Sequence, residues 1–180
     1  MVSEMNTDHM DLYAAPSWQC VMICWGTKYS TTLINNLARS IANKTASQPR
    51  FILISDRDRP DLADRIELVR FPEFWLQDRL KTSGCQAKLL MFDHGIVPTD
   101  LPAIYVDLDT IVLGDLSTGL DLMQNRQTVA ILQSAIIPFG WIGRSLYRWT
   151  NRRRYARGNS SFVIYHPAEC HFIGSPPSPP

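Results

Sequence analysis

Short runs of hydrophobic residues alternate along this chain with segments in which hydrophobic residues recur every three or four positions. The runs that predict strands are residues 18–26, 50–55, 66–69, 103–106, 128–133 and 161–166. Between the first two runs, Leu33, Leu37 and Ile41 recur at a spacing of four, which predicts a helix with one buried stripe. Ser30 precedes this helix and can cap its first turn.

Two further segments have the spacing of helices. Residues 86–93 predict a helix that ends at Gly95, because glycine readily adopts the left-handed conformation that terminates helices. Residues 144–155 predict another helix between the last two strands. Strands that alternate with helices in this order predict an α/β fold, with a largely parallel central sheet flanked by helices.

The composition is that of a single globular domain. Of the 180 residues, 45% are hydrophobic and 19% are charged, and the formal net charge is +1. These proportions exclude a disordered or fibrous chain, and the near-neutral charge gives no general reason to bind nucleic acid. We expect a domain at residues 18–172, after a flexible segment at 1–17 and before a disordered proline-rich tail at 173–180.

The cysteines and the hydrophobic stretches bear on the cellular location. The four cysteines, which show neither CxxC spacing nor the density of a disulfide framework, are Cys20, Cys24, Cys85 and Cys170. We expect reduced, mostly buried thiols, with Cys20 and Cys24 on the same face of the first strand. The first residues lack a signal-peptide pattern, and the hydrophobic stretch 129–142 is too interrupted for a transmembrane segment. The expected location is therefore cytoplasmic.

Basic residues are concentrated late in the chain. From Arg144 onward the formal charge is +5, because six arginines between Arg144 and Arg157 are followed by a single acid, Glu169. A solvated helix face is the simpler interpretation of this cluster, and peripheral contact with phosphate or an anionic membrane surface is the alternative.

Two aspartates at the end of a hydrophobic strand are the most informative residues. Asp107 and Asp109 follow the strand 103–106, and their spacing of two places both carboxylates on the same side of the chain. The hydrophobic residues 111–113 follow them, so we expect a buried segment on either side of the pair. Ligands of open α/β sheets bind at the carboxyl ends of strands, and a divalent cation commonly offsets paired carboxylates. We therefore predict a site for Mn²⁺ or Mg²⁺; a turn cap beside a solvated side chain is the alternative.

The aspartates belong to the segment YVDLDTIVLGDL, which follows VMICWGTKY and AKLLMF and precedes RGNSSFVIYHP. These segments, in this order over about residues 18–170, resemble the nucleotide-sugar-dependent glycosyltransferases of the GT-A fold, especially glycosyltransferase family 8. The resemblance implies a Rossmann-like GT-A domain that transfers a sugar from a nucleoside diphosphate sugar, expected to be a UDP-sugar, to an acceptor hydroxyl with retention of configuration. It also implies a C-terminal truncation, because such domains continue past the last of these segments.

The resemblance implies roles for single residues as well. Asp109 matches the firmer metal ligand of the family's DxD motif, and Asp107 matches the position shared between metal and ribose. The residues at positions that hold the donor are Trp25, Gly26, Thr27, Lys28, Tyr29, Asp56, Lys88, Asn159, Ser160 and Ser161. Asp56 matches a contact to the base, and Lys88 matches a basic residue near the sugar and phosphates. Each of these residues could instead have a purely structural role, as a core aromatic, a turn residue or a solvated surface charge.

Other functions fit the sequence less well. A phosphatase of the haloacid-dehalogenase type would use Asp107 as nucleophile and Asp109 as acid and base, but no lysine follows Thr110. The motifs of dinucleotide-dependent dehydrogenases and of P-loop enzymes are not in the sequence. A non-catalytic nucleotide-sugar-binding remnant is the other alternative.

His171 loosely matches a late metal-binding histidine of the family, but it follows the aspartates too soon. The sequence identifies no general base.

Overall fold

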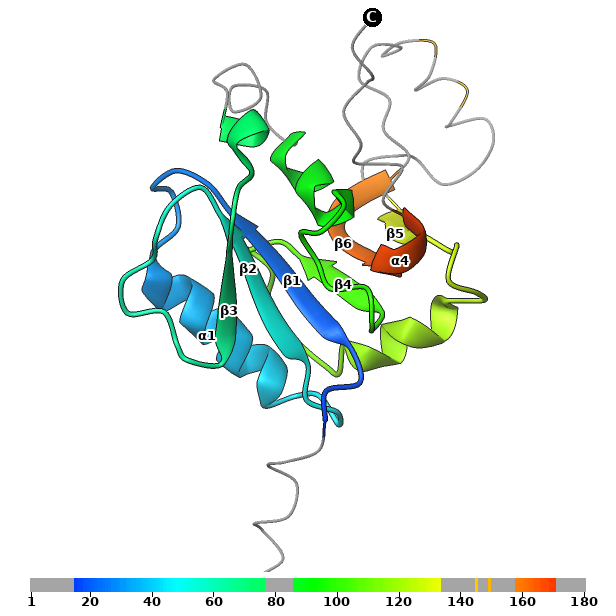
Figure 1. Cartoon of the computed structure of the whole chain (residues 1–180). Coiled ribbons are helices and arrows are strands. Elements are labelled where there is room, and N and C mark those ends of the chain that lie inside the picture. Colours follow the sequence, from blue (N-terminus) through cyan, green and yellow to red (C-terminus); the bar gives the residue numbers. More distant parts are fainter. Residues whose placement is uncertain (1–14, 77–85, 134–144, 146–148, 150–157, 171–180) are drawn as a thin grey trace, which may run out of the picture.

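The computed structural model describes residues 15–76, 86–133, 145, 149 and 158–170, and these form a layered α/β domain (Figure 1). Its strands are β1 (Gln19–Cys24), β2 (Arg50–Ser55), β3 (Ile66–Arg70), β4 (Ala103–Val106), β5 (Ala130–Gln133) and β6 (Gly158–Tyr165). They form one sheet in the order β3-β2-β1-β4-β6-β5. The first four pair in parallel, and β6 runs antiparallel to both β4 and β5. The predicted α/β fold with a mostly parallel sheet is confirmed.

Helices cover both faces of the sheet. On one face lie α1 (Thr31–Ala42) and the 3₁₀ helix η4 (Ser117–Leu122) (Figure 1). On the other lie the 3₁₀ helix η3 (Gln86–Phe92) and the short helix α4 (Pro167–Cys170), and η2 (Glu73–Leu76) follows β3. The side chains of each strand alternate between the two hydrophobic layers, so every central strand is buried on both sides.

Strand β1 shows how this alternation works. Cys20 and Cys24 pack in the layer under α1, and Val21 and Ile23 pack in the layer under η3. Both cysteines are free and buried, as predicted, and burial raises the pKa of each thiol. These thiols therefore stay protonated and serve as small hydrophobic side chains.

Helix α1 begins where the sequence predicts. The Ser30 hydroxyl oxygen accepts a hydrogen bond of 3.2 Å from the Leu33 backbone N–H, which satisfies one of the free donors of the first turn. The buried face consists of Ile34, Leu37, Ala38, Ile41 and Ala42. Leu33, which we predicted to lie on the buried stripe, is exposed instead, because the stripe is centred one position further along the helix.

The segment predicted as a helix at 86–93 is a 3₁₀ helix rather than an α-helix. Ala87 and Leu90 are both buried against the sheet, and residues three apart share one side of a 3₁₀ helix. The 3₁₀ helix ends at Phe92, one residue before the predicted end, and Gly95 lies in the following turn with a φ of 81°.

The hydrophobic residues after the two aspartates are only partly buried. Val112 is buried and Leu108 is buried between the aspartates, but Ile111 is 81% exposed and Leu113 is 84% exposed. This alternation is that of a segment lying along the surface, in which every second side chain faces the core. The prediction of a buried segment at 111–113 is therefore wrong for Ile111 and Leu113.

Several predictions lie outside the described residues. They concern residues 1–14 of the flexible segment, the tail at 173–180, Cys85, His171 and most of the basic cluster at 144–157. Within that cluster, Ser145 and Trp149 are described, and both are helical. Among the helices of the described ranges, none has the length and hydrophobicity needed to cross a membrane.

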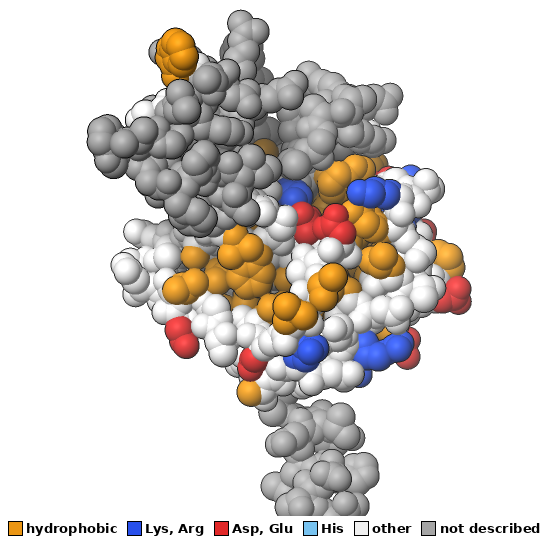
Figure 2. All heavy atoms as spheres, turned by 180° about the vertical axis from the view of Figure 1, so that it is seen from behind, with side chains coloured by type: hydrophobic (Ala, Val, Ile, Leu, Met, Phe, Trp, Pro, Cys, Tyr) orange, Lys and Arg blue, Asp and Glu red, His pale blue; other side chains and the backbone are white. Residues whose placement is uncertain are grey.

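Charged side chains of both signs lie together on one face of the molecule. Figure 2 shows the face opposite to the view of Figure 1, and near its centre acidic and basic side chains adjoin each other. Hydrophobic side chains lie next to them on the same face.

Candidate functional site

A cleft of about 270 Å³ opens where the central parallel strands end. Its walls are formed by Ile23, Trp25, Lys28, Tyr29, Lys88, Asp107, Leu108 and Asp109. Strands β1 and β4 are parallel neighbours, so the residues that follow their carboxyl ends meet at one edge of the sheet. The cleft thus has two carboxylates, two ammonium groups and two aromatic rings on its walls.

Asp107 is fixed by hydrogen bonds to both of its carboxylate oxygens. Lys88 Nζ donates to Oδ2 at 2.6 Å, and the Tyr105 hydroxyl donates to Oδ1 at 2.5 Å. The side chains of Lys88 and Asp107 are 12% and 20% exposed, so this ion pair is only partly hydrated. Lys88 Nζ also lies 3.4 Å from the Ser160 carbonyl and hydroxyl oxygens. Three predicted site residues, Lys88, Asp107 and Ser160, are therefore in contact.

Asp109 meets the loop that follows β1. The Tyr29 hydroxyl donates a 3.2 Å hydrogen bond to Asp109 Oδ2, and the Lys28 ammonium lies 4.7 Å from the centroid of the Tyr29 ring. The interaction with Tyr29 and the negative charges of Asp109 and Asp107 raise the pKa of Lys28. Lys28 is therefore a permanent cation on the rim of the cleft.

Asp107 and Asp109 offer the carboxylate oxygens that a hard divalent cation prefers as ligands. Mg²⁺ is usually bound through one or two carboxylates, together with substrate phosphates and water. Asp109 Oδ1 accepts no hydrogen bond within the described residues, whereas both oxygens of Asp107 do. A cation would therefore be held chiefly by Asp109, with Asp107 as a shared ligand. The described residues contain no cluster of three or more His, Cys, Asp or Glu side chains suited to a metal, so a cation here would take further ligands from water or from substrate phosphates.

Asp56 lies beside the loop after β1 and is not among the residues that line the cleft. Its oxygens accept hydrogen bonds from the Gly26 N–H at 3.2 and 3.3 Å and from the Arg57 guanidinium. Burial favours a higher pKa for Asp56, but the bonds from Arg57 and Gly26 and the charges of Arg57 and Arg59 outweigh it and hold the pKa below its ordinary value. The predicted contact of Asp56 with a base stays a prediction.

The other predicted donor residues are not among those that line the cleft. Gly26 has a φ of 65°, which favours glycine, and no atom lies within 4 Å of the point where a Cβ would stand, so its backbone is open to close approach. Thr27 is exposed. Asn159 accepts hydrogen bonds at Oδ1 from the N–H and the hydroxyl of Ser161, so its side chain is used within β6.

Sequence reasoning missed Arg59. Its guanidinium lies behind the loop after β1 with 6% of the side chain exposed. In the turn DRDRPD nothing in the pattern distinguishes Arg59 from Arg57, because the difference lies in what each side chain reaches. It also missed Ile23 and Leu108, which contribute the hydrophobic part of the cleft.

A scan against protein-family models and a search of curated proteins found no match to the sequence. Solved structures do match. The galactosyltransferase LgtC, in complex with donor and acceptor sugar analogues, has a TM-score of 0.59 and 12% identity, over 86% of this chain and 59% of LgtC. The apo form of the glycosyltransferase GlyE from Streptococcus pneumoniae TIGR4 has a TM-score of 0.51 and 13% identity, over 88% of this chain and 36% of GlyE.

The apo form of mouse xyloside xylosyltransferase 1 also matches, with a TM-score of 0.51 and 13% identity, over 84% of this chain and 68% of that protein. These similarities show that the chain has the fold of GT-A glycosyltransferases. They do not distinguish family 8 from other families of that fold. The chain covers less than two thirds of the length of LgtC.

Proposed function

We propose that this chain is the donor-binding domain of a glycosyltransferase that uses a nucleoside diphosphate sugar, expected to be a UDP-sugar. The observation that carries the proposal is the cleft at the carboxyl ends of β1 and β4, where Asp107 and Asp109 lie beside Lys28 and Lys88. A diphosphate is strongly anionic, and the two lysines offer charge-assisted hydrogen bonds to it. Trp25 and Tyr29 provide the flat apolar surfaces that a nucleobase needs.

The chemistry of sugar transfer explains why these residue types are needed. When the bond from the sugar to the diphosphate breaks, negative charge develops on the leaving group, and groups that stabilise this charge lower the barrier. A divalent cation at Asp109 and Asp107 supplies Lewis-acid stabilisation when bound. Lys88 holds Asp107 in place on the cleft wall, and Lys88 and Lys28 both line the cleft in which the leaving group would lie. The acceptor hydroxyl attacks the anomeric carbon, and we assign no base to it.

Calorimetry with UDP tests the proposal directly. We expect UDP to bind the wild-type chain in Mn²⁺ and to bind at least about tenfold more weakly in EDTA, since the cation links the aspartates to the phosphates. Asp109→Ala should remove this metal effect. Asp121→Ala, which changes an exposed carboxylate of η4 outside the cleft, should leave it intact. Equal binding of UDP in Mn²⁺ and in EDTA would exclude the metal, and failure of UDP to bind under either condition would exclude the nucleotide site.

Two assays then separate transfer from its alternatives. Release of UDP from a UDP-sugar indicates a catalytic domain, whereas binding without release indicates a nucleotide-sugar-binding domain without activity. Cleavage of a generic phosphate ester in the absence of nucleotide would indicate the phosphatase instead. In the structure both oxygens of Asp107 accept hydrogen bonds, from Lys88 and Tyr105, which disfavours Asp107 as a nucleophile.

A further inference from the structure

One short loop supplies much of the proposed donor site. Residues 25–29 follow β1 and lead to Ser30, the cap of α1, and the side chains of Trp25, Lys28 and Tyr29 line the cleft. Such a loop needs a fixed backbone if its side chains are to meet a ligand in one arrangement. The contacts that fix it come from the turn after β2.

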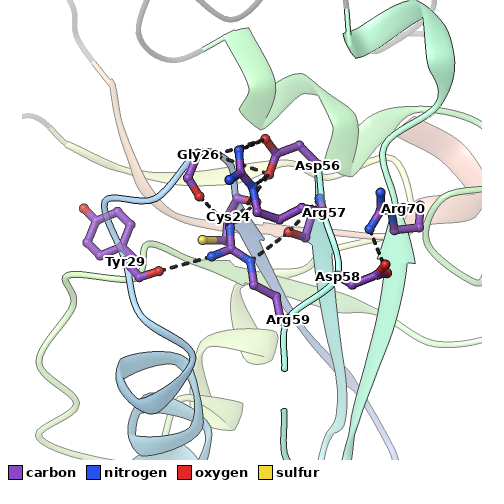
Figure 3. A network of polar contacts seen from close by, with 9 residues as sticks. Cys24, Gly26, Tyr29, Asp56, Arg57, Asp58, Arg59 and Arg70 are labelled. Atoms are coloured by element: carbon purple, nitrogen blue, oxygen red, sulfur yellow. Dashed lines mark hydrogen bonds and ion pairs between the residues drawn. The ribbon is translucent and has the colours of Figure 1, made fainter. Parts of the chain in front are cut away.

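Arg59 holds the backbone of this loop from behind (Figure 3). Its Nη2 donates to the carbonyl oxygens of Gly26 at 3.0 Å and Cys24 at 3.4 Å, and its Nη1 donates to the carbonyl oxygen of Tyr29 at 3.2 Å. Its Nε donates to the Ser55 hydroxyl oxygen at 3.1 Å, which anchors the guanidinium to the end of β2. A single planar group therefore ties the last residue of β1 and two residues of the loop to the end of the neighbouring strand β2.

Asp56 completes the arrangement by binding the backbone N–H of Gly26, the residue whose carbonyl oxygen Arg59 binds. It accepts hydrogen bonds from the Gly26 N–H, and one of its oxygens lies 3.8 Å from Arg59 Nη2. Both backbone polar groups of Gly26 are thus bound, the N–H by Asp56 and the carbonyl by Arg59. The side chains of Asp56 and Arg59 are 10% and 6% exposed, so solvent weakens these contacts little.

The neighbouring arginine does not share this role. Arg57 also pairs with Asp56, at 3.0 Å, but its side chain is 46% exposed and no hydrogen bond to a loop carbonyl is found for it among the described residues (Figure 3). Both arginines compensate the charge of Asp56, but of the two only Arg59 reaches the loop. Variants of Arg57 and Arg59 therefore separate the loss of charge compensation from the loss of the loop contacts.

We propose that Arg59 is a positioning residue for nucleotide binding. Together with Asp56 it holds the loop 25–29 in the shape that presents Trp25, Lys28 and Tyr29 to the donor. This role rests on the proposed function, since it concerns the same cleft. A loop that is ordered before the ligand arrives loses less conformational entropy on binding, so Arg59 raises affinity without touching the nucleotide.

The test combines hydrogen–deuterium exchange with UDP calorimetry in Mn²⁺ on the full chain. In Arg59→Gln we expect amide exchange in residues 25–30 to accelerate, and the Kd for UDP to rise about tenfold because ordering the loop then opposes binding. In Arg59→Lys, both the amide exchange rate and the Kd for UDP should lie between those of Arg59→Gln and the wild type. An ammonium keeps the charge but lacks the forked guanidinium that reaches three carbonyls. Arg57→Gln is the matched control, and it should change neither quantity more than about twofold.

Each outcome bears on the proposal. Faster exchange of the loop with unchanged UDP affinity in Arg59→Gln overturns it, and so does an equal loss of affinity in Arg57→Gln. Should the Arg59 variants unfold, Asp56→Asn decides the matter, because it weakens the hold on Gly26. Faster exchange of the loop together with lower UDP affinity then supports the proposal, whereas lower affinity with unchanged exchange indicates a direct contact of Asp56 with the nucleotide and overturns it. Failure of the wild type to bind UDP rejects the proposed function itself, a result that differs from a failure confined to the Arg59 variants.

Discussion

Two aspartates of this molecule occupy equivalent places in the sheet and serve different ends. Asp56 directly follows β2 and Asp107 directly follows β4, so both carboxylates lie at the carboxyl edge of the parallel strands. Asp107 pairs with a lysine and stays on the wall of the cleft, whereas Asp56 pairs with arginines and a backbone N–H behind a loop. An acid after a buried strand is thus compatible with either role, and its partners decide which role it has.

The largest effect should come from Asp107→Ala, which removes the aspartate of the cleft. Lys88 is left without its closest anionic partner, and the cleft loses one of its two carboxylates. We expect UDP affinity in Mn²⁺ to fall about 100-fold. The free energy of unfolding should fall by about 2 kcal/mol, because a partly buried ammonium loses its ion pair. Calorimetry measures the affinity and urea denaturation measures the free energy of unfolding. A UDP affinity equal to that of the wild type would show that Asp107 does not take part in UDP binding.

Lys88→Met breaks the same ion pair from the other side. We expect UDP affinity to fall about tenfold, because one cation of the cleft is lost. The affinity for Mn²⁺ alone should rise, since Oδ2 of Asp107 no longer accepts from Lys88. Lys28→Met is the matched comparison, because Lys28 contacts the Tyr29 ring and donates to neither aspartate in the described residues. A fall in Mn²⁺ affinity in Lys88→Met would contradict this account.

Asp56→Asn should change stability in a way that depends on pH. The folded state holds the pKa of Asp56 below its ordinary value, so the charged form stabilises the fold above that value and the contribution is lost as pH falls through the lowered pKa. We expect the wild type to exceed the variant by about 1–2 kcal/mol at pH 7 and by less at about pH 3. Urea denaturation at a series of pH values measures this difference. If the stability difference between the wild type and the variant instead grows as pH falls, the charged form of Asp56 does not stabilise the fold.

The smallest effect should come from Asp100→Asn, at the opposite edge of the sheet. Asp100 makes two hydrogen bonds with Arg50, at 2.7 and 2.8 Å, but its side chain is 54% exposed. Solvent screens such a pair, so we expect a loss of about 0.5 kcal/mol in unfolding free energy. Urea denaturation in low and high salt tests this value, since added salt should reduce the loss of unfolding free energy. A loss of stability as large as that in Asp56→Asn would show that burial does not explain the difference in stability that we expect between the two aspartates.

The local pattern of the sequence predicts the strands and the aspartate pair but not their partners. Residues 50–55 form a strand in the structure as predicted, because a run of buried β-branched and aromatic side chains needs no distant information. The contacts of Arg59 with the loop depend on the side-by-side placement of β1 and β2, which no local spacing encodes. The exposure of Ile111 and Leu113 likewise depends on which elements pack over them. The 3₁₀ form of η3 follows from its fit against the sheet.

The last strand has a consequence for how this protein is made. Asp107 donates its backbone N–H to the Ser161 carbonyl, and Lys88 reaches Ser160, a residue 72 positions later in the chain. During synthesis, Lys88 and Asp107 leave the ribosome before β6, so the Ser160 and Ser161 oxygens reach them only when that strand arrives. The full set of contacts of Lys88 and Asp107 is therefore complete only once β6 has paired with β4.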